Sequence, residues 1–164
     1  MKLPTIWLKD YVRIKSIKDL SRQMTSIGHM LDGKPISTEN ETILDLEVRQ
    51  NRSDCLSIIG LAREVSAITN QPLKLKPLKP LKKRLTPKYH LKITEPKLCF
   101  RFNSVHLSNI TVQKSPSWLI DRLEAYGIKT INSLVDITNF VMVEYGQPLH
   151  AFDFQKLPAK ELTV

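Results

Sequence analysis

The spacing of apolar residues predicts a small mixed unit in the first seventy residues. Residues 44–48 (LDLEV) alternate between apolar and charged side chains, which is the pattern of a half-buried β-strand. Residues 5–8 (TIWL) predict a second, shorter strand. Apolar positions recur at helical spacing over residues 17–27, behind Ser16 as a candidate N-cap and before Gly28 as a stop. Strands and helices are therefore both expected in this part of the chain.

A further helix is predicted after the strand at 44–48. It begins at Ser53 or Asp54, because either residue can cap a first turn, and it fades at Asn70 before Pro72. Its apolar face repeats every three residues and consists of Leu56, Ile59, Ala62 and Val65.

The second half of the chain has its own pattern of strands and helices. Residues 100–112 predict strands, with a turn at 108–109. Ser115 is a candidate N-cap, and Pro116 fits the first position of the helix that follows. Gly127 predicts the end of that helix.

One more helix is predicted over residues 132–145, with Gly146 as its terminator. Its apolar residues are Leu134, Val135, Val141 and Met142. Together these elements predict an α+β fold that is built from two small mixed units.

A basic, proline-rich connector separates the two units, which gives a division into residues 1–70, 71–92 and 93–164. Its prolines, too closely spaced for a helix, are Pro72, Pro77, Pro80 and Pro87. Eight basic and no acidic residues lie in it, namely Lys74, Lys76, Lys79, Lys82, Lys83, Arg84, Lys88 and Lys92. The net charge of the whole chain is +9, so the rest is nearly neutral. The connector is either a strip that contacts RNA phosphates, with Lys79, Lys82, Lys83 and Arg84 as candidates, or a solubilising tether.

Composition excludes several classes of protein. Apolar residues make up 41% of the 164 residues, as in globular proteins, and no apolar run approaches the ~20 residues that span a bilayer. Cys55 and Cys99 form no C-x-x-C pair and no export signal is visible, so a reducing, cytoplasmic location is expected. The four histidines lack metal-ligand spacing, and the five glycines form no phosphate-binding loop. No metal site and no cofactor of this chain itself are expected.

Two sequence stretches carry a resemblance to a known family. The first is ILDLEVRQNRSDCLS at residues 43–57, followed by GLAREV at 60–65. The second is INSLVDITNFVM at residues 131–142, continuing to GQPLHAFD at 146–153. In this order they resemble the first domain, and then the opening of the editing (B3/B4-like) domain, of the bacterial-type phenylalanyl-tRNA synthetase β subunit.

The resemblance implies a part in the ATP-dependent charging of tRNA(Phe) with phenylalanine. Catalysis, with its ATP and Mg²⁺, would belong to the α subunit, and the expected partners are that subunit and tRNA, not a membrane. Only residues 32–42 separate the helix end from the strand, so the oligonucleotide-binding domain that the family usually inserts there is absent. The rest of the editing domain is missing after Val164, which leaves a natural short protein, a split gene and a trimmed fragment all open.

The resemblance also points to residues of an editing pocket, in which mischarged tRNA is hydrolysed. His150 matches a histidine of that pocket, where an imidazole could orient the attacking water or contact the tRNA 3′ end. Lys129 stands where the family commonly has an arginine, and it keeps the charge without the planar fork. The alternative for His150 is a packing role. For Arg52 and Asp54 we expect a structural role, with Asp54 as a cap and Arg52 paired to Glu47 or Glu64.

Three functional hypotheses follow. The first is a subunit or fragment of phenylalanine–tRNA ligase without a complete active site of its own. The second is a non-enzymatic RNA-binding or assembly module derived from the β subunit. The third is a free-standing hydrolase of mischarged tRNA, for which the pocket's acidic residue and threonine have no counterpart before Val164.

Overall fold

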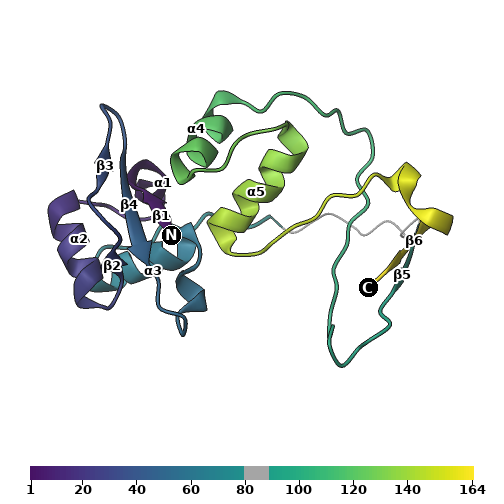
Figure 1. Ribbon diagram of the computed structural model, residues 1–164, viewed down its shortest axis with the longest axis horizontal. Coiled ribbons are helices and arrows are strands. Elements are labelled where there is room, and N and C mark those ends of the chain that lie inside the picture. The colour runs from purple at the N-terminus through teal and green to yellow at the C-terminus, as the bar shows by residue number, and fades with distance from the viewer. Residues whose placement is uncertain (80–88) are drawn as a thin grey trace. The chain divides into compact units, whose positions relative to one another are not determined.

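The computed structural model describes residues 1–79 and 89–164, which form two compact units. The first unit contains residues 1–76 and 113–149, and the second contains residues 77–112 and 150–164 (Figure 1). Helices and two small sheets give a mixed α+β fold, as predicted. This grouping follows contacts within the structure, whereas the division predicted from sequence follows the basic, proline-rich connector; that division stays a prediction. Among the described residues, no helix has the length and apolar character to cross a bilayer.

The sheet of the first unit is organised around β4 (Thr42–Glu47). β1 (Lys2–Pro4), β2 (Met30–Leu31) and β3 (Ile36–Ser37) all pair with it in antiparallel orientation. Burial alternates along β4, because one face of the strand points into the core. The strand predicted at 44–48 is therefore confirmed, with slightly earlier bounds.

The predicted strand at residues 5–8 is wrong, because these residues form the short helix α1 (Thr5–Lys9). Their β-branched and aromatic side chains favour a strand locally, but packing decides otherwise. The buried residues after the helix start lie at helical spacing, and they are Trp7, Leu8, Tyr11 and Val12. A strand would turn Trp7 and Leu8 to opposite faces, whereas both are fully buried in one core.

The helix predicted at residues 17–27 is confirmed as α2 (Ile17–Ser26). The Ser16 hydroxyl oxygen accepts a hydrogen bond from the backbone N–H of Asp19 at 3.2 Å, as the capping pattern predicts. Gly28 follows the helix with φ of +95°, a conformation that glycine adopts most readily.

The helix predicted from Ser53 or Asp54 begins later than expected. Ser53–Cys55 form a separate 3-10 turn, η1, and α3 runs over Ile58–Thr69. Ser57 is extended, with φ of −157°, and its hydroxyl oxygen caps the helix by accepting from the Gly60 N–H at 2.9 Å. Leu56 precedes this cap and is 54% exposed, so its predicted place on the apolar face is wrong.

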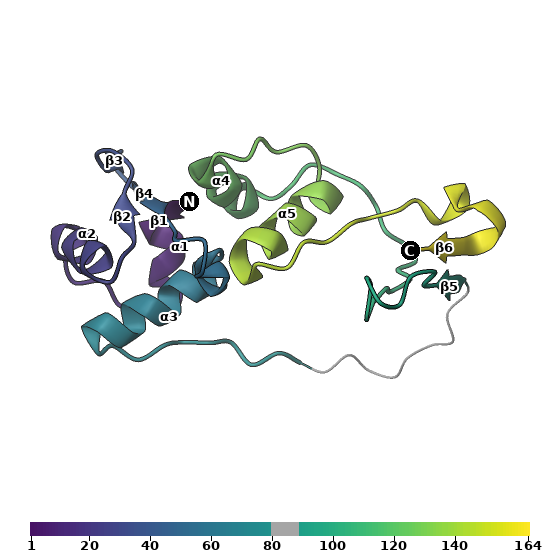
Figure 2. The same cartoon turned by 60° about the horizontal axis from the view of Figure 1, so that its bottom comes forward.

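Two further helices, α4 (Ser117–Tyr126) and α5 (Ser133–Tyr145), complete the first unit and lie side by side (Figure 2). Both end at the predicted glycines, which are left-handed. Ser115 is not the cap of α4, because its buried hydroxyl donates to the Asp136 carboxylate on α5. Pro116 takes the N-cap position instead of the first helical one.

The buried face of α5 differs from the apolar face that the sequence suggests. Its buried residues are Asp136, Val143 and Glu144, whereas Met142 is 38% exposed. Glu144 accepts hydrogen bonds from the Trp7 indole N–H at 3.3 Å and from the Tyr11 hydroxyl. These polar contacts join α5 to α1 and the turn after it, so buried hydrogen bonds and not hydrophobicity alone orient the helix.

The second unit contains the parallel pair β5 (His90–Lys92) and β6 (Glu161–Thr163). The 3-10 turns η2 (Phe154–Lys156) and η3 (Pro158–Lys160) lie directly before β6 in the chain. The strands predicted within 100–112 are wrong, because this segment pairs with no strand among the described residues. Its apolar side chains are largely exposed, as 88% exposure of Phe100 shows. An alternating pattern fits a strand, but a strand forms only where a neighbour accepts its hydrogen bonds.

We predict that Gly60→Ala destabilises the protein although alanine favours helices. A Cβ at residue 60 would lie 1.9 Å from the Asp54 carbonyl oxygen, so η1 or α3 would have to shift. Overpacking of this kind costs about 1–3 kcal/mol, against roughly 0.5–1 kcal/mol gained from helix propensity. Urea unfolding measures the net change.

Ala67→Gly, at an exposed position of the same helix, measures the propensity contribution alone and should cost roughly 0.5–1 kcal/mol. A Gly60→Ala protein as stable as the parent, or more stable, would show that η1 does not press on α3 as described.

Candidate functional site

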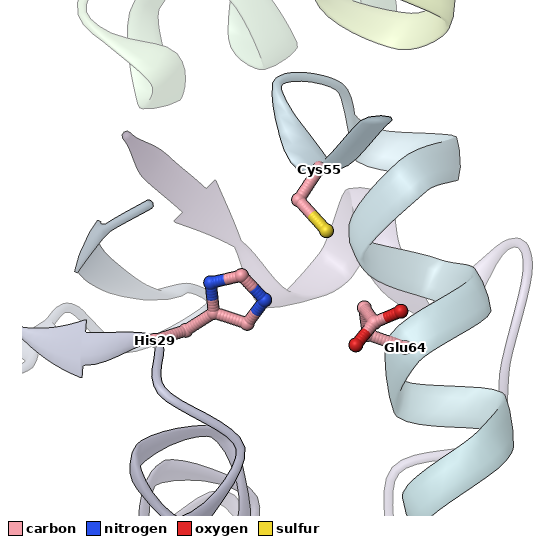
Figure 3. A group of neighbouring side chains, drawn as sticks. All are labelled: His29, Cys55 and Glu64. Atoms are coloured by element: carbon pink, nitrogen blue, oxygen red, sulfur yellow. The ribbon is translucent and has the colours of Figure 1, made fainter. Parts of the chain in front are cut away.

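Three side chains with metal-binding or proton-transfer chemistry converge in the core of the first unit (Figure 3). His29 lies in the turn between α2 and β2, Cys55 ends η1, and Glu64 lies on α3. One donor atom from each, a ring nitrogen, the Sγ and a carboxylate oxygen, lie within 4.8 Å of one another. Figure 3 shows the imidazole, the thiol and the carboxylate directed toward a common space. We call this group the His29–Cys55–Glu64 cluster.

His29 is the least satisfied polar side chain of the described residues. It is 1% exposed, and neither ring nitrogen has a hydrogen-bond partner within the described part of the chain. Burial lowers the pKa of His29, and the nearby Arg52 cation lowers it further. The imidazole is therefore neutral, and each of its nitrogens is unsatisfied.

Arg52 contacts two members of the cluster, Cys55 and Glu64, and also the neighbouring Asp54. Its Nε and Nη2 donate to the two oxygens of Asp54 at 3.0 and 2.8 Å, a bidentate pair. Nη2 also lies 2.7 Å from Glu64 Oε1 and 3.1 Å from Cys55 Sγ. The hydrogen bonds from Arg52 hold the pKa of Asp54 at about 2, and those to Asp54 and Glu64 raise the pKa of Arg52.

The sequence predicts that Arg52 pairs with Glu47 or Glu64, and the structure shows that the partner is Glu64. The expected capping role of Asp54 is wrong, because Ser57 caps α3 and Asp54 instead holds the guanidinium.

Cys55 is fully buried, and this burial raises the pKa of its thiol to about 12. A hydrogen bond from the thiol to Asp54 acts in the same direction, and the Arg52 charge opposes both. Nucleophilic cysteines have a depressed pKa and partial exposure. Cys55 therefore fits the role of a packed thiol or a metal ligand, and not that of a nucleophile.

Sequence reasoning identified the stretch around Cys55 but missed His29. The three residues are separated by 26 and 9 positions, which matches no metal-ligand spacing, and only tertiary packing brings them together. The signal that could have drawn attention to His29 is its place directly after a helix-terminating glycine and before a strand, a position at which the chain enters the core.

The two editing-pocket candidates belong to different units, and the surroundings of each are therefore described separately. His150 is exposed in the second unit, and Lys129 is exposed in the first. Neither makes a side-chain hydrogen bond or ion pair within the described residues. Their editing and substrate-binding roles stay predictions.

The RNA-contact candidates are described only in part. Lys79 is exposed, whereas Lys82, Lys83 and Arg84 lie outside the described residues. Earlier in the connector, the Lys74 N–H donates to the Tyr11 carbonyl oxygen at 2.7 Å, so the connector begins against the first unit. RNA contact by these residues stays a prediction.

Comparisons with known proteins point to one group. The family model of the B3/4 domain matches residues 98–164. The chain is 43% identical over 126 residues to the phenylalanine–tRNA ligase β subunit of Synechococcus sp. strain JA-3-3Ab, covering 77% of this chain and 15% of that protein. The corresponding β subunit of Carboxydothermus hydrogenoformans is 45% identical over 126 residues, which cover 76% of this chain and 16% of that protein.

The β subunit of Rhodopirellula baltica is 36% identical over 160 residues, covering 96% of this chain and 24% of that protein. The chain thus spans between 15% and 24% of the length of these relatives.

We predict that Cys99 reacts with an aromatic disulfide reagent in the native, metal-free protein and that Cys55 does not. Cys55 is fully buried, and with a pKa of about 12 only roughly 10⁻⁴ of its thiol is ionised at pH 8. One thiol should be titrated in buffer and two in denaturant. Cys99→Ser should remove the native reaction, and Cys55→Ser should leave it; the reverse pattern would contradict the described burial.

Proposed function

We propose that this chain, which is homologous over most of its length to bacterial phenylalanine–tRNA ligase β subunits, serves the charging of tRNA(Phe) with phenylalanine as a β-type subunit or fragment. Catalysis would reside in the α subunit, together with the ATP and Mg²⁺ that the whole enzyme uses. The cytoplasm is the expected compartment. The observation that carries this proposal is identity of 36% along 96% of the chain.

The placement of the first family-like stretch supports a scaffolding role for the first unit. Within NRSDCLS, the Arg52–Asp54 pair and the Ser57 cap fix η1 against α3, and Cys55 is buried beneath. Cys55 and Ser57 are buried, whereas Arg52 and Asp54 pair at the surface, where the Asp54 side chain is 61% exposed. Residues with this arrangement maintain a fold and its surfaces, which suits a subunit that supports chemistry in a partner chain.

Editing of mischarged tRNA is a second candidate, favoured by the match of the B3/4 domain to residues 98–164 and by the resemblance that includes His150. An ester-hydrolysing site needs a positioned water together with donors for the developing oxyanion. His150 is exposed and could serve such a site only together with groups that the described residues do not place beside it. We therefore rank editing behind the subunit role.

Association with the α subunit tests the proposed function. We expect the purified chain to form a stable complex with the α subunit encoded in the same genome, measured by size-exclusion chromatography and calorimetry. The chain alone should give no phenylalanine-dependent pyrophosphate exchange. If the chain does not bind the α subunit, and binds unrelated structured RNA and tRNA(Phe) equally tightly, it is instead an RNA-binding or assembly module.

We also predict that tRNA affinity depends on the connector. Each phosphate contact contributes about −0.7 to −0.9 to the slope of log affinity against log salt. Neutralising Lys79, Lys82, Lys83 and Arg84 to glutamine should therefore flatten that slope by up to about 3.

The matched control changes four exposed lysines of the first unit by the same charge, namely Lys9, Lys15, Lys18 and Lys34. Equal losses in the two variants would show that only net charge matters and that the connector has no special contact with tRNA.

A further inference from the structure

We propose that the His29–Cys55–Glu64 cluster binds a zinc-type divalent cation. This inference is independent of the proposed function, and it departs from the expectation from sequence that the chain has no metal site. An imidazole nitrogen, a thiolate sulfur and a carboxylate oxygen form a donor set that suits Zn²⁺. The three donors come from three different elements and meet in the interior (Figure 3).

The geometry is close to that of a bound ion. Zinc bonds of about 2.0–2.3 Å place tetrahedral ligands roughly 3.3–3.8 Å apart. The three donor atoms lie within 4.8 Å of one another, so they need to approach by about 1 Å. Glu64 is half-buried on α3, and its carboxylate can supply this movement together with the Arg52 guanidinium that it contacts. Three protein ligands leave the fourth position to water.

His29 supplies the independent reason to infer a ligand. Buried polar groups are almost always hydrogen-bonded, because an unpaired one loses its hydration without compensation. His29 is 1% exposed, lacks a partner at both nitrogens among the described residues, and has its ring directed at Cys55 and Glu64 (Figure 3). A metal bond would satisfy one of these two nitrogens.

The charges of the site also fit a divalent cation. The Arg52 guanidinium lies nearby, but its bidentate pair with Asp54 balances its charge. The ion then meets two anionic donors, Glu64 and the Cys55 thiolate, which together balance its charge. On binding, the S–H bond of Cys55 breaks, a sulfur–metal bond forms, and the proton leaves to the buffer.

Arg52 would act as an outer partner of two ligands. Its Nη2 contacts Glu64 Oε1 at 2.7 Å and Cys55 Sγ at 3.1 Å, which keeps both side chains turned toward the cluster. A bound ion would link the turn after α2 to η1 and α3. It would therefore stabilise the first unit in proportion to its occupancy.

The test uses the full chain, stripped with a chelator and titrated with Co²⁺ alone. We expect one equivalent to give the intense d–d absorption of four-coordinate cobalt together with a thiolate-to-cobalt charge-transfer band. Zn²⁺ should displace the cobalt and raise the Tm. Cys55→Ser should abolish the charge-transfer band, and His29→Asn and Glu64→Gln should each weaken binding at least about tenfold.

The matched controls replace the same residue types outside the cluster, as Cys99→Ser, His106→Asn and Glu39→Gln, and should bind like the parent. No saturable binding, or a charge-transfer band that survives Cys55→Ser and disappears in Cys99→Ser, would overturn the proposal. If a cluster variant does not fold, zinc X-ray absorption of the Cys99→Ser protein, which keeps Cys55, decides: one sulfur ligand supports the site, and none overturns it.

Discussion

The close approach of η1 to α3 at Gly60 is the constraint on which the rest of the first unit depends. The carbonyl oxygen of Asp54 occupies the space that a Cβ of residue 60 would fill, so only glycine allows the turn to lie on the helix. This approach sets Cys55 beside Glu64 and lets Arg52 reach both. It also brings Ser57 within 3.3 Å of where a Cβ of Gly146 would be, at the end of α5.

A second set of buried contacts holds α5 in place. The Glu144 carboxylate accepts from Trp7 and Tyr11, and Phe140 stacks on Trp7 with ring centroids 4.9 Å apart. Burial and the Glu144 hydrogen bond raise the pKa of Tyr11, so its hydroxyl stays protonated as a donor. Leaving a buried donor without its acceptor costs about 1–3 kcal/mol. Residues 133–145 therefore pack with the N-terminal sheet unit although they lie far along the chain.

In both features, residues of the two family-like stretches make structural contacts within the first unit. The first stretch supplies the turn, the cap and the buried thiol, and the second supplies α5, whose Glu144 and Phe140 reach α1. The described side chains of both stretches thus hold elements of the first unit together. Among the buried side-chain polar atoms of residues 1–79 and 89–164, those without a hydrogen-bond partner belong to His29, which is the reason to look for a ligand there.

The sequence by itself determined the α+β class, β4, α2, the ends of α4 and α5 and the family resemblance, and it named Glu64 as one of two candidate partners of Arg52. Each follows from short-range physics: strand alternation, side-chain caps, glycine at positive φ, or a distinctive motif. Only the tertiary structure decided the rest. Residues 5–8 form a helix, residues 100–112 pair with no strand among the described residues, Asp136 and Glu144 are buried, and His29 lies near Cys55. Those outcomes depend on hydrogen bonds and packing contacts between residues that are far apart in the sequence. The local spacing of apolar and polar residues does not reveal such contacts.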